Sequence, residues 1–214
     1  MTEPILFGAA YSVYVRAARL ALAEKRIPYR LIEVDIFAPE GPSPEYMQRH
    51  PFKRIPAFEH EGFRLYETGA ITRYIDEVFA GPPLMPTTSR ARARVNQIVS
   101  IMDNYGYRPL IWDVFVERVR APAQGRSADE AKIAAALPRA ETCLRAIEAL
   151  ADPDGPSLAG GDVSLADLHA APMFAYFCMA KEGAELLASQ PHLSRWWQAM
   201  RNRPSMAATR SPLE

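Results

Sequence analysis

The first eighty residues alternate between two patterns of hydrophobic positions. Short apolar or alternating runs, which are typical of strands, occur at residues 5–7, 31–36, 57–59 and 63–66. The longer apolar spacing of a helix occurs at residues 15–22, briefly at 45–50, and again at 70–78. The predicted order is therefore strand, helix, strand, short helix, strand, strand, helix.

This order predicts a small mixed sheet. A strand, a helix and a second strand normally form a parallel pair joined by a right-handed crossover. The last two strands follow each other closely around Glu61 and Gly62, and they are expected to form an antiparallel hairpin at the edge of the sheet. The N-terminal part of the chain is therefore expected to be an α/β domain.

The pattern changes after about residue 88, because every later apolar period is helical. A long period that begins at Val95 is expected to bend at Pro109. The change predicts an N-terminal domain, a linker rich in glycine and proline, and an all-helical domain, at residues 1–80, 81–88 and 89–214.

Ser164 and Asp167 form a capping signal where one helical period begins. A hydroxyl and a carboxylate three residues apart can cap the first backbone amides of a helix reciprocally. We interpret this pair as a folding signal rather than a catalytic one.

Composition excludes several classes of function. The 214 residues include 25 basic and 25 acidic side chains, so the formal net charge is zero. Without a strong electrostatic field, the chain is not expected to bind nucleic acid or an anionic membrane surface. No apolar run approaches the roughly 20 residues of a membrane-spanning helix, and the N-terminus lacks the pattern of a secretory signal. A cytoplasmic location is therefore expected.

Cysteine and histidine usage predicts no metal or disulfide chemistry. Cys143 and Cys178 lie far apart in helical segments, so neither a disulfide framework nor a redox pair is expected. The four histidines show no spacing that is typical of metal ligands. We therefore expect no metal site.

Residues 52–71, FKRIPAFEHEGFRLYETGAI, have the features of a peptide-binding edge. Because Pro56 cannot donate a hydrogen bond to a sheet, a cis Ile55–Pro56 bond would leave the backbone of Ile55 available to an extended ligand. Glu67 and Thr68 begin the following helix, where unpaired amides favour a carboxylate and the Glu67 side chain would attract an ammonium group. A peptide-like ligand with an amino acid head group fits both features.

The segment HPFKRIPAFEHEGFRLYETGAITRYI resembles the glutathione-binding segment of cytosolic glutathione transferases, closest to the phi class and its bacterial serine-type relatives. Those proteins have the pattern NPFG-Q-V/I-PA, an acidic stretch, and then L-F/Y-E-S-R-A-I. The first strand and helix, ILFGAAYSVYVRAARLALAEK, and the capping sequence SLADL also resemble this family, so the resemblance covers nearly the whole chain. It implies the glutathione transferase fold, with a thioredoxin-like N-terminal domain and an all-α C-terminal domain.

The resemblance also implies roles for individual residues. The backbone of Ile55 would pair with the cysteinyl part of glutathione, while Glu67 and Thr68 would hold its γ-glutamyl end. Arg54 stands where the family often has glutamine. The resemblance does not assign the glycyl carboxylate to a residue of this chain, and we expect Lys53 or Arg54 to bind it.

The sequence departs from the family pattern at the site of that carboxylate. Gly41 and Pro42 lie where phi enzymes have basic residues, and Thr68 replaces the usual serine. Glutathione recognition is therefore expected, but its affinity is not fixed by the pattern.

Ser12 matches the hydroxyl that activates the thiol in serine-type members of the family. A free thiol with a pKa of about 8.5 is mostly protonated at neutral pH, although the thiolate is the nucleophile. Lowering that pKa by about two units requires about 2.7 kcal/mol, which a charge-assisted hydrogen bond and a helix N-terminus can supply. Alternatively, Ser12 is only a helix cap, and Tyr11 and Tyr14 are rival hydroxyls.

The second substrate is expected to bind in an apolar pocket between the domains. Tyr107, Ile111 and Phe115 lie four residues apart on one helical face, and with Tyr11 they are the candidate pocket residues. The alternative is that this stripe is interdomain core, because aromatic residues at helical spacing commonly pack.

The leading hypothesis is an enzyme that adds the glutathione thiolate to a hydrophobic electrophile. Glutathione would be a co-substrate, and the resemblance implies detoxification and a homodimer. One alternative is a non-catalytic binding or assembly module with the same fold. Another is a glutathione-dependent peroxidase or isomerase that uses the same thiolate. The sequence does not identify the electrophile.

Overall fold

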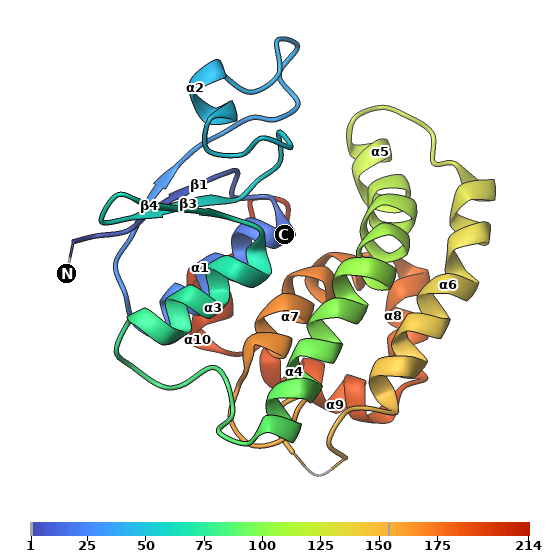
Figure 1. Ribbon diagram of the computed structural model, residues 1–214. Helices are drawn as coiled ribbons and strands as arrows, with labels where there is room; N and C mark the ends of the chain where they lie inside the picture. The colour runs from blue at the N-terminus through green and yellow to red at the C-terminus, as the bar shows by residue number, and fades with distance from the viewer. Residues whose placement is uncertain (1, 154) are drawn as a thin grey trace. The chain divides into compact units, whose positions relative to one another are not determined.

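The computed structural model describes residues 2–153 and 155–214. The chain folds as two compact units, one formed by the described residues up to Leu84 with Pro204–Glu214, the other by Met85–Arg203 (Figure 1). Among the helices of these residues, none combines the length and the hydropathy that a membrane-spanning segment needs.

A four-stranded mixed sheet with the order β2-β1-β3-β4 forms the centre of the first unit. Its strands are β1 (Ile5–Phe7), β2 (Arg30–Ile32), β3 (Ala57–His60) and β4 (Phe63–Tyr66). Strand β1 pairs in parallel with β2 and antiparallel with β3, which pairs antiparallel with β4. The predicted parallel pair and antiparallel hairpin are both confirmed.

Helices cover both faces of this sheet. They are α1 (Val13–Glu24), α2 (Pro44–Met47), α3 (Thr68–Val78) and α10 (Pro204–Ala208). Helices α1 and α3 lie side by side on one face, whereas α2 lies beyond the other (Figure 1). The predicted apolar face of α1 is fully buried, since Val15, Ala18, Ala21 and Leu22 are each 0% exposed.

Strand β2 is shorter than the sequence predicted, because the apolar pattern continues to Ile36 but the pairing ends at Ile32. Phe7, the last residue of β1, pairs with Ile32. The Gly8 N–H then donates to the Ile32 carbonyl at 2.9 Å, and the chain turns at Gly8 with a φ of 153°. Strand β1 therefore offers no further partner, so the expected strand over residues 31–36 was too long.

The C-terminal segment Pro204–Glu214 belongs to the first unit, although the sequence placed it in a helical domain of residues 89–214. Arg16 of α1 explains the difference. Arg16 is only 2% exposed, and its side chain donates to the Met206 carbonyl at 3.1 Å and pairs with the Glu214 carboxylate. A buried guanidinium needs such partners, and the returning segment supplies them.

The second unit is entirely helical. Its elements are α4 (Ser89–Ile101), η1 (Met102–Gly106), η2 (Arg108–Arg120), α5 (Ala121–Ala123), α6 (Glu130–Glu148), α7 (Leu165–Phe177), α8 (Lys181–Ala188) and α9 (Pro191–Met200). The all-α C-terminal domain is therefore confirmed as a fold class, and with the mixed sheet it gives the expected two-part architecture.

The segments η1 and η2 have widened turns. The Tyr107 N–H donates to the Met102 carbonyl, and the Ala121 N–H donates to the Val116 carbonyl, in each case five residues back. These are π-helical turns, in place of the simple bend expected at Pro109. Pro109 has no amide hydrogen and cannot donate within this run. The spacing of apolar residues did not distinguish the two kinds of helix.

Helix α7 forms the core of the second unit, and all of its residues are buried. Asp167 in its first turn is 0% exposed and accepts four hydrogen bonds. The donors are the Leu158 N–H, the Ser164 N–H and the Ser164 hydroxyl, each at 2.8 Å, and the Trp196 indole N–H at 2.7 Å. Burial raises the pKa of Asp167, and the four donors counter part of that rise. The predicted capping pair is confirmed, and it also ties α7 to α9.

The substitution Asp167→Asn tests this arrangement. An amide places N–H hydrogens where two of the four donors now point, which leaves buried donors unpaired and should lower the free energy of unfolding by about 3 kcal/mol. Urea unfolding followed by circular dichroism measures the loss. Asp162→Asn, at an exposed position in the preceding loop, is the control and should unfold as the wild type does. Equal midpoints for Asp167→Asn and wild type would contradict this role.

Candidate functional site

The loop between β1 and α1 lies against two other parts of the first unit at Gly8. A Cβ atom there would lie 2.5 Å from Cγ2 of Val15 and 3.2 Å from Cβ of Ile55. Glycine is therefore required both by this close approach and by the φ of 153°. The approach holds the loop that carries Ser12 next to the segment that carries Ile55.

Ser12 is the N-cap of α1. Its Oγ accepts a long hydrogen bond, 3.4 Å, from the Val15 N–H. A hydroxyl that accepts through a lone pair still has its own hydrogen to donate. The cap and the proposed donor to a thiolate are therefore compatible roles for the same side chain.

The chain enters β3 through a constrained segment in which residues 51–54 are exposed, whereas Ile55 is only 7% exposed. The Tyr46 hydroxyl donates to the Arg54 carbonyl at 2.6 Å, and the Lys53 N–H donates to the His50 carbonyl at 3.0 Å. The Ile55–Pro56 bond is cis, as the sequence suggested. Pairing of β3 begins only at Ala57, so Ile55 lies outside the ladder of the sheet.

Lys53 and Arg54 are two exposed cations beside Ile55. No carboxylate oxygen within residues 2–153 and 155–214 lies within 4.0 Å of either side-chain charge. Lys53 also has a φ of 55°, a left-handed conformation that costs a non-glycine residue about 1 kcal/mol. The segment thus presents unpaired positive charge at the expected end of the peptide ligand.

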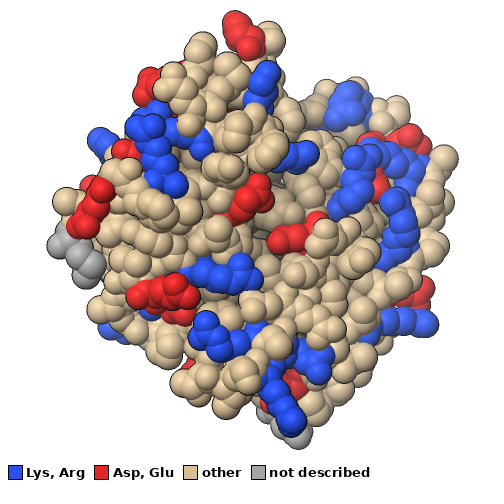
Figure 2. Space-filling view, viewed as in Figure 1, with Lys and Arg blue, Asp and Glu red and all other residues tan. Residues whose placement is uncertain are grey.

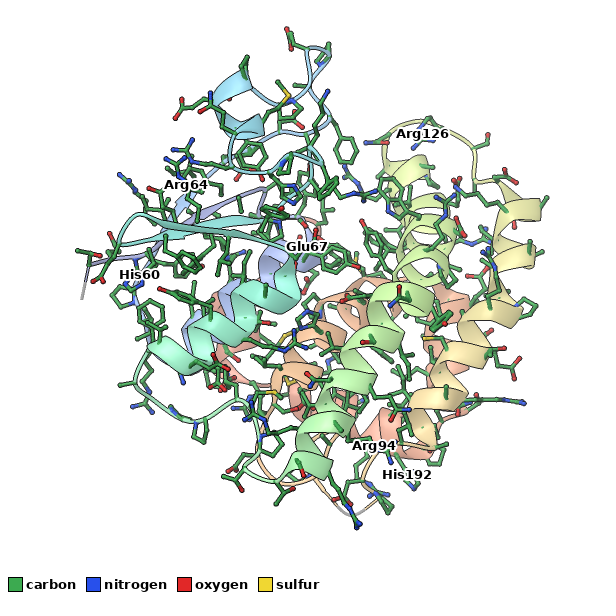
Figure 3. The ribbon with its side chains drawn as sticks, viewed as in Figure 1. His60, Arg64, Glu67, Arg94, Arg126 and His192 are labelled. Carbon is green, nitrogen blue, oxygen red and sulfur yellow. The ribbon has the colours of Figure 1, made fainter. Side chains whose placement is uncertain are left out.

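Glu67 begins α3 in a strained conformation. Its φ is 71° and its ψ is 115°, and its carbonyl accepts from the N–H groups of Ala70 and Ile71 at 3.0 Å. The side chain is exposed and lies where α3 meets the sheet (Figure 3), whereas the adjacent Thr68 is 7% exposed. The first amides of α3 have no partner within the helix, so this corner combines amide donors with a carboxylate. A strained backbone of this kind is a reason to suspect function.

His50 lies beside these groups, and the sequence analysis did not single it out. His50 is 2% exposed, and its ring lies 5.0 Å from the Tyr66 ring, centroid to centroid. Burial lowers the pKa of His50, the charge of Glu67 raises it and the charge of Arg54 lowers it. His50 is therefore uncharged at neutral pH and within electrostatic reach of two candidate ligand-binding residues. In the sequence, only its position directly before Pro51 and Phe52 could have marked it as a candidate site residue.

Tyr11 stacks on Phe37, with ring centroids 6.4 Å apart and an angle of 26° between the rings. Phe37 is 61% exposed, so this pair forms an aromatic surface next to Ser12. The sequence predicted Tyr11 as a pocket residue but missed Phe37, because the two lie in different loops and share no period.

The other three candidate pocket residues lie in the second unit. Ile111 and Phe115 are 6% and 2% exposed, and Phe115 stacks on Tyr176 with ring centroids 4.3 Å apart and an angle of 5°. Tyr107 is half-buried. Phe115 is thus part of the packing between η2 and α7. A pocket shared by these residues and Tyr11 stays a prediction.

The charged side chains of the described residues form no metal-binding cluster, and on the face seen in Figure 2 they form no patch of a single sign. Acidic and basic groups are interspersed over the visible face (Figure 2). The described residues contain no group of three or more His, Cys, Asp or Glu side chains that could hold a metal ion. Burial raises the pKa of the Cys143 and Cys178 thiols to about 12, so both are protonated at neutral pH. A reactive thiolate would therefore have to come from a ligand.

Comparison with known proteins agrees with this geometry. The family model for the glutathione S-transferase N-terminal domain matches residues 3–77, and the model for the C-terminal domain matches residues 107–204. The probable glutathione S-transferase GSTF1 of Oryza sativa subsp. japonica is 30% identical over 99% of this chain and 99% of its own length.

Solved structures show the same similarity. Glutathione transferase F7 from Populus trichocarpa has a TM-score of 0.82 and 30% identity, and the match covers 96% of this chain and 97% of that one. Glutathione S-transferase I from mais, in complex with an atrazine glutathione conjugate, has a TM-score of 0.83 and 25% identity over 97% of this chain and 96% of that one. The chain therefore belongs to the glutathione S-transferase family.

Proposed function

We propose that this protein is a glutathione S-transferase, which ionises the thiol of glutathione and directs it at a hydrophobic electrophile. The observation that carries the proposal is the close approach at Gly8. It places the hydroxyl of Ser12, at the N-terminus of α1, on a loop that lies against Ile55. Ile55 is outside the sheet ladder and is free to pair with a peptide.

The first unit offers a partner for each polar part of glutathione. The cysteinyl backbone pairs with Ile55, the α-ammonium group with Glu67, and the α-carboxylate with Thr68 and the first amides of α3. Lys53 and Arg54 bind the glycyl carboxylate. This assignment explains why two unpaired cations and a strained acidic residue occur on one exposed edge.

Ser12 lowers the pKa of the bound thiol. Its hydroxyl donates to the sulfur, and the N-terminus of α1 adds a favourable electrostatic interaction with the thiolate. The thiol proton passes to solvent. The sulfur electron pair then forms a bond to an electrophilic carbon, and either a leaving group departs or the product takes up a proton. Because the protein's own thiols are protonated at neutral pH, the nucleophile is that of glutathione.

The electrophile binds to apolar and aromatic side chains. On the first unit these are Tyr11 and Phe37, which stack on each other beside Ser12. Activity on hydrophobic electrophiles is consistent with the similarity to a transferase solved with an atrazine glutathione conjugate. Detoxification in the cytoplasm is the role that we infer.

We also infer a homodimer. An exposed aromatic pair of the first unit supports it, since Phe52 is 66% exposed and Tyr66 38%. Phe52 and Tyr66 lie edge to face with centroids 6.0 Å apart. Exposed aromatic side chains of this kind are typical of protein interfaces.

One observation favours a second function, a glutathione-binding module without turnover. Gly41 and Pro42 are uncharged and half-buried where phi enzymes have basic residues. Weak binding of the glycyl carboxylate would lower the fraction of sites that glutathione occupies at its cellular concentration. Peroxidase and isomerase reactions use the same thiolate as conjugation, so they share the proposed site.

Ser12→Ala tests the proposed catalytic role. The variant should bind glutathione within about threefold of wild type, because Ser12 contacts only the sulfur. It should lose the ultraviolet absorbance of the bound thiolate at neutral pH, with the thiol pKa returning toward about 8.5. Isothermal titration and a pH titration of the absorbance make the two measurements. A thiolate signal that persists in Ser12→Ala rules out this role, and binding with no thiolate in wild type supports the module.

Lys53→Gly separates ligand binding from backbone strain. Glycine adopts a φ of 55° without strain, so the variant should gain up to about 1 kcal/mol in stability. Loss of the charge should nevertheless raise the dissociation constant for glutathione about tenfold. Urea unfolding and isothermal titration measure the two effects.

Glu61→Gly is the matched control for that test, because Glu61 is exposed in the hairpin turn and has a φ of 52°. It should gain similar stability and leave glutathione affinity unchanged. Equal affinities for Lys53→Gly and wild type would show that the lysine does not hold the glycyl carboxylate.

A further inference from the structure

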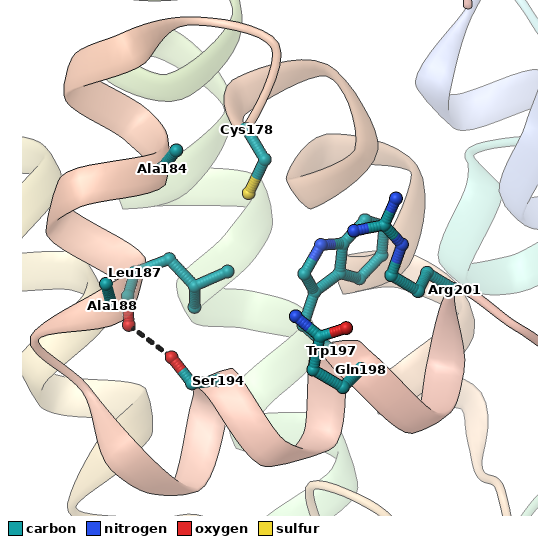
Figure 4. A pocket seen from close by; sticks show the side chains of 8 residues that line it. All are labelled: Cys178, Ala184, Leu187, Ala188, Ser194, Trp197, Gln198 and Arg201. Atoms are coloured by element: carbon teal, nitrogen blue, oxygen red, sulfur yellow. Dashed lines mark hydrogen bonds between the residues drawn. The ribbon is translucent and has the colours of Figure 1, made fainter.

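The peptide-binding edge differs in kind from the hollow at the end of α7 and along α8 and α9. That hollow is lined by side chains, among them Cys178, Trp197 and Arg201, and none of its lining residues belongs to the edge (Figure 4). At the edge, the proposed contact at Ile55 is made by the backbone, so it depends on how one peptide group is oriented. Affinity there therefore depends on the groups that hold this peptide group in place.

The Arg54–Ile55 peptide group has its carbonyl bonded within the protein and its N–H free. The Tyr46 hydroxyl donates to the Arg54 carbonyl at 2.6 Å. The Arg54–Ile55 bond is trans, and the carbonyl and N–H of a trans peptide group point in opposite directions. The Ile55 N–H therefore points away from Tyr46, and among residues 2–153 and 155–214 it has no acceptor.

Tyr46 is itself held in place within α2. It is 4% exposed, and its N–H donates at 3.2 Å to Oγ of Ser43, the N-cap of the helix. Its ring lies 6.5 Å from the ring of Phe7 in β1, centroid to centroid. Arg49, just after α2, pairs with Glu59 of β3 at 3.5 Å, and its guanidinium carbon lies 4.7 Å from the centroid of the Phe7 ring. The hydroxyl is therefore presented by a segment that is fixed on the sheet.

The chemistry of this hydrogen bond favours donation from Ile55 to a ligand. Burial raises the pKa of Tyr46, so its hydroxyl keeps the hydrogen at neutral pH. A hydrogen bond accepted by the carbonyl polarises the peptide group, which makes the N–H at the other end a stronger donor. The Ile55 side chain packs at Gly8, where an added Cβ atom would lie 3.2 Å from Cβ of Ile55. Recognition at this position therefore falls to the backbone.

We propose that Tyr46 is a positioning residue for glutathione. Its hydroxyl orients the Arg54–Ile55 peptide group, and the Ile55 N–H then donates to the carbonyl of the cysteinyl residue. Because Tyr46 acts through this peptide group, it contributes to the binding of glutathione and not to the ionisation of the thiol by Ser12. This role rests on the proposed function, since it takes glutathione as the ligand.

Tyr46→Phe tests this role, because it keeps the ring and removes only the hydroxyl. The dissociation constant for glutathione, measured by isothermal titration, should rise about fivefold. The pKa of the bound thiol, measured by ultraviolet absorbance, should stay as in wild type. Tyr29→Phe is the matched control, since it removes a hydroxyl that bonds to Arg19 at 2.9 Å in the same unit. The control should bind glutathione as wild type does.

Two further measurements separate positioning from a loss of structure. A glutathione analogue with a trans alkene in place of the amide between cysteine and glycine lacks the carbonyl acceptor. Tyr46→Phe should therefore change the affinity for this analogue by less than about twofold. In the ligand-free protein, the heteronuclear NOE of the Ile55 amide should fall in Tyr46→Phe, because the peptide group is no longer held, and stay unchanged in Tyr29→Phe.

Equal glutathione affinities of Tyr46→Phe and wild type would overturn the proposal. An equal loss of affinity for glutathione and for the alkene analogue, or an unchanged NOE of the Ile55 amide in Tyr46→Phe, would also overturn it. Failure of the wild type to bind glutathione is a different result. It would contradict the proposed function, while the NOE, which needs no ligand, still decides whether Tyr46 orients the peptide group.

Discussion

The close packing around Gly8 is the constraint on which the chemistry of the first unit depends. Any side chain at this position would collide with Val15 of α1 and Ile55 of the β3 approach. Since the glycine allows both contacts, the start of α1 and the peptide-binding edge are held together by backbone packing. Ser12 follows this junction in the same loop, as the N-cap of α1. Strand β1 also ends there, which is why β2 can extend no further.

The peptide-binding edge beside this junction contains residues with strained backbone and unpaired charge. Lys53 and Glu67 both have positive φ values, and both are exposed. Their side chains do not compensate for this strain, because Lys53 lacks a carboxylate partner among the described residues and Glu67 makes no capping bond with its side chain. A ligand with a carboxylate and an ammonium group would satisfy both. The second unit differs, since the buried carboxylate of Asp167 accepts four hydrogen bonds from within the protein.

Local patterns predicted most of the fold, because they report burial and capping directly. The face of α1, the hairpin at Glu61 and the capping pair at Asp167 follow from residues a few positions apart. The errors came from contacts between distant segments. Strand β2 was too long because its length is set by β1, and the C-terminal segment was misplaced because only the buried guanidinium of Arg16 shows where it packs. In the site, His50 and Phe37 were missed for the same reason, since each gains its importance from a neighbour in another loop.

The most direct test of the account is a crystal structure of the protein with glutathione. The account predicts the sulfur within about 3.5 Å of the Ser12 Oγ, and hydrogen bonds between the cysteinyl backbone and Ile55. It also predicts the ammonium group beside Glu67. A tripeptide bound elsewhere, or one whose sulfur points away from Ser12, would contradict the claim that the junction at Gly8 brings the hydroxyl to the peptide.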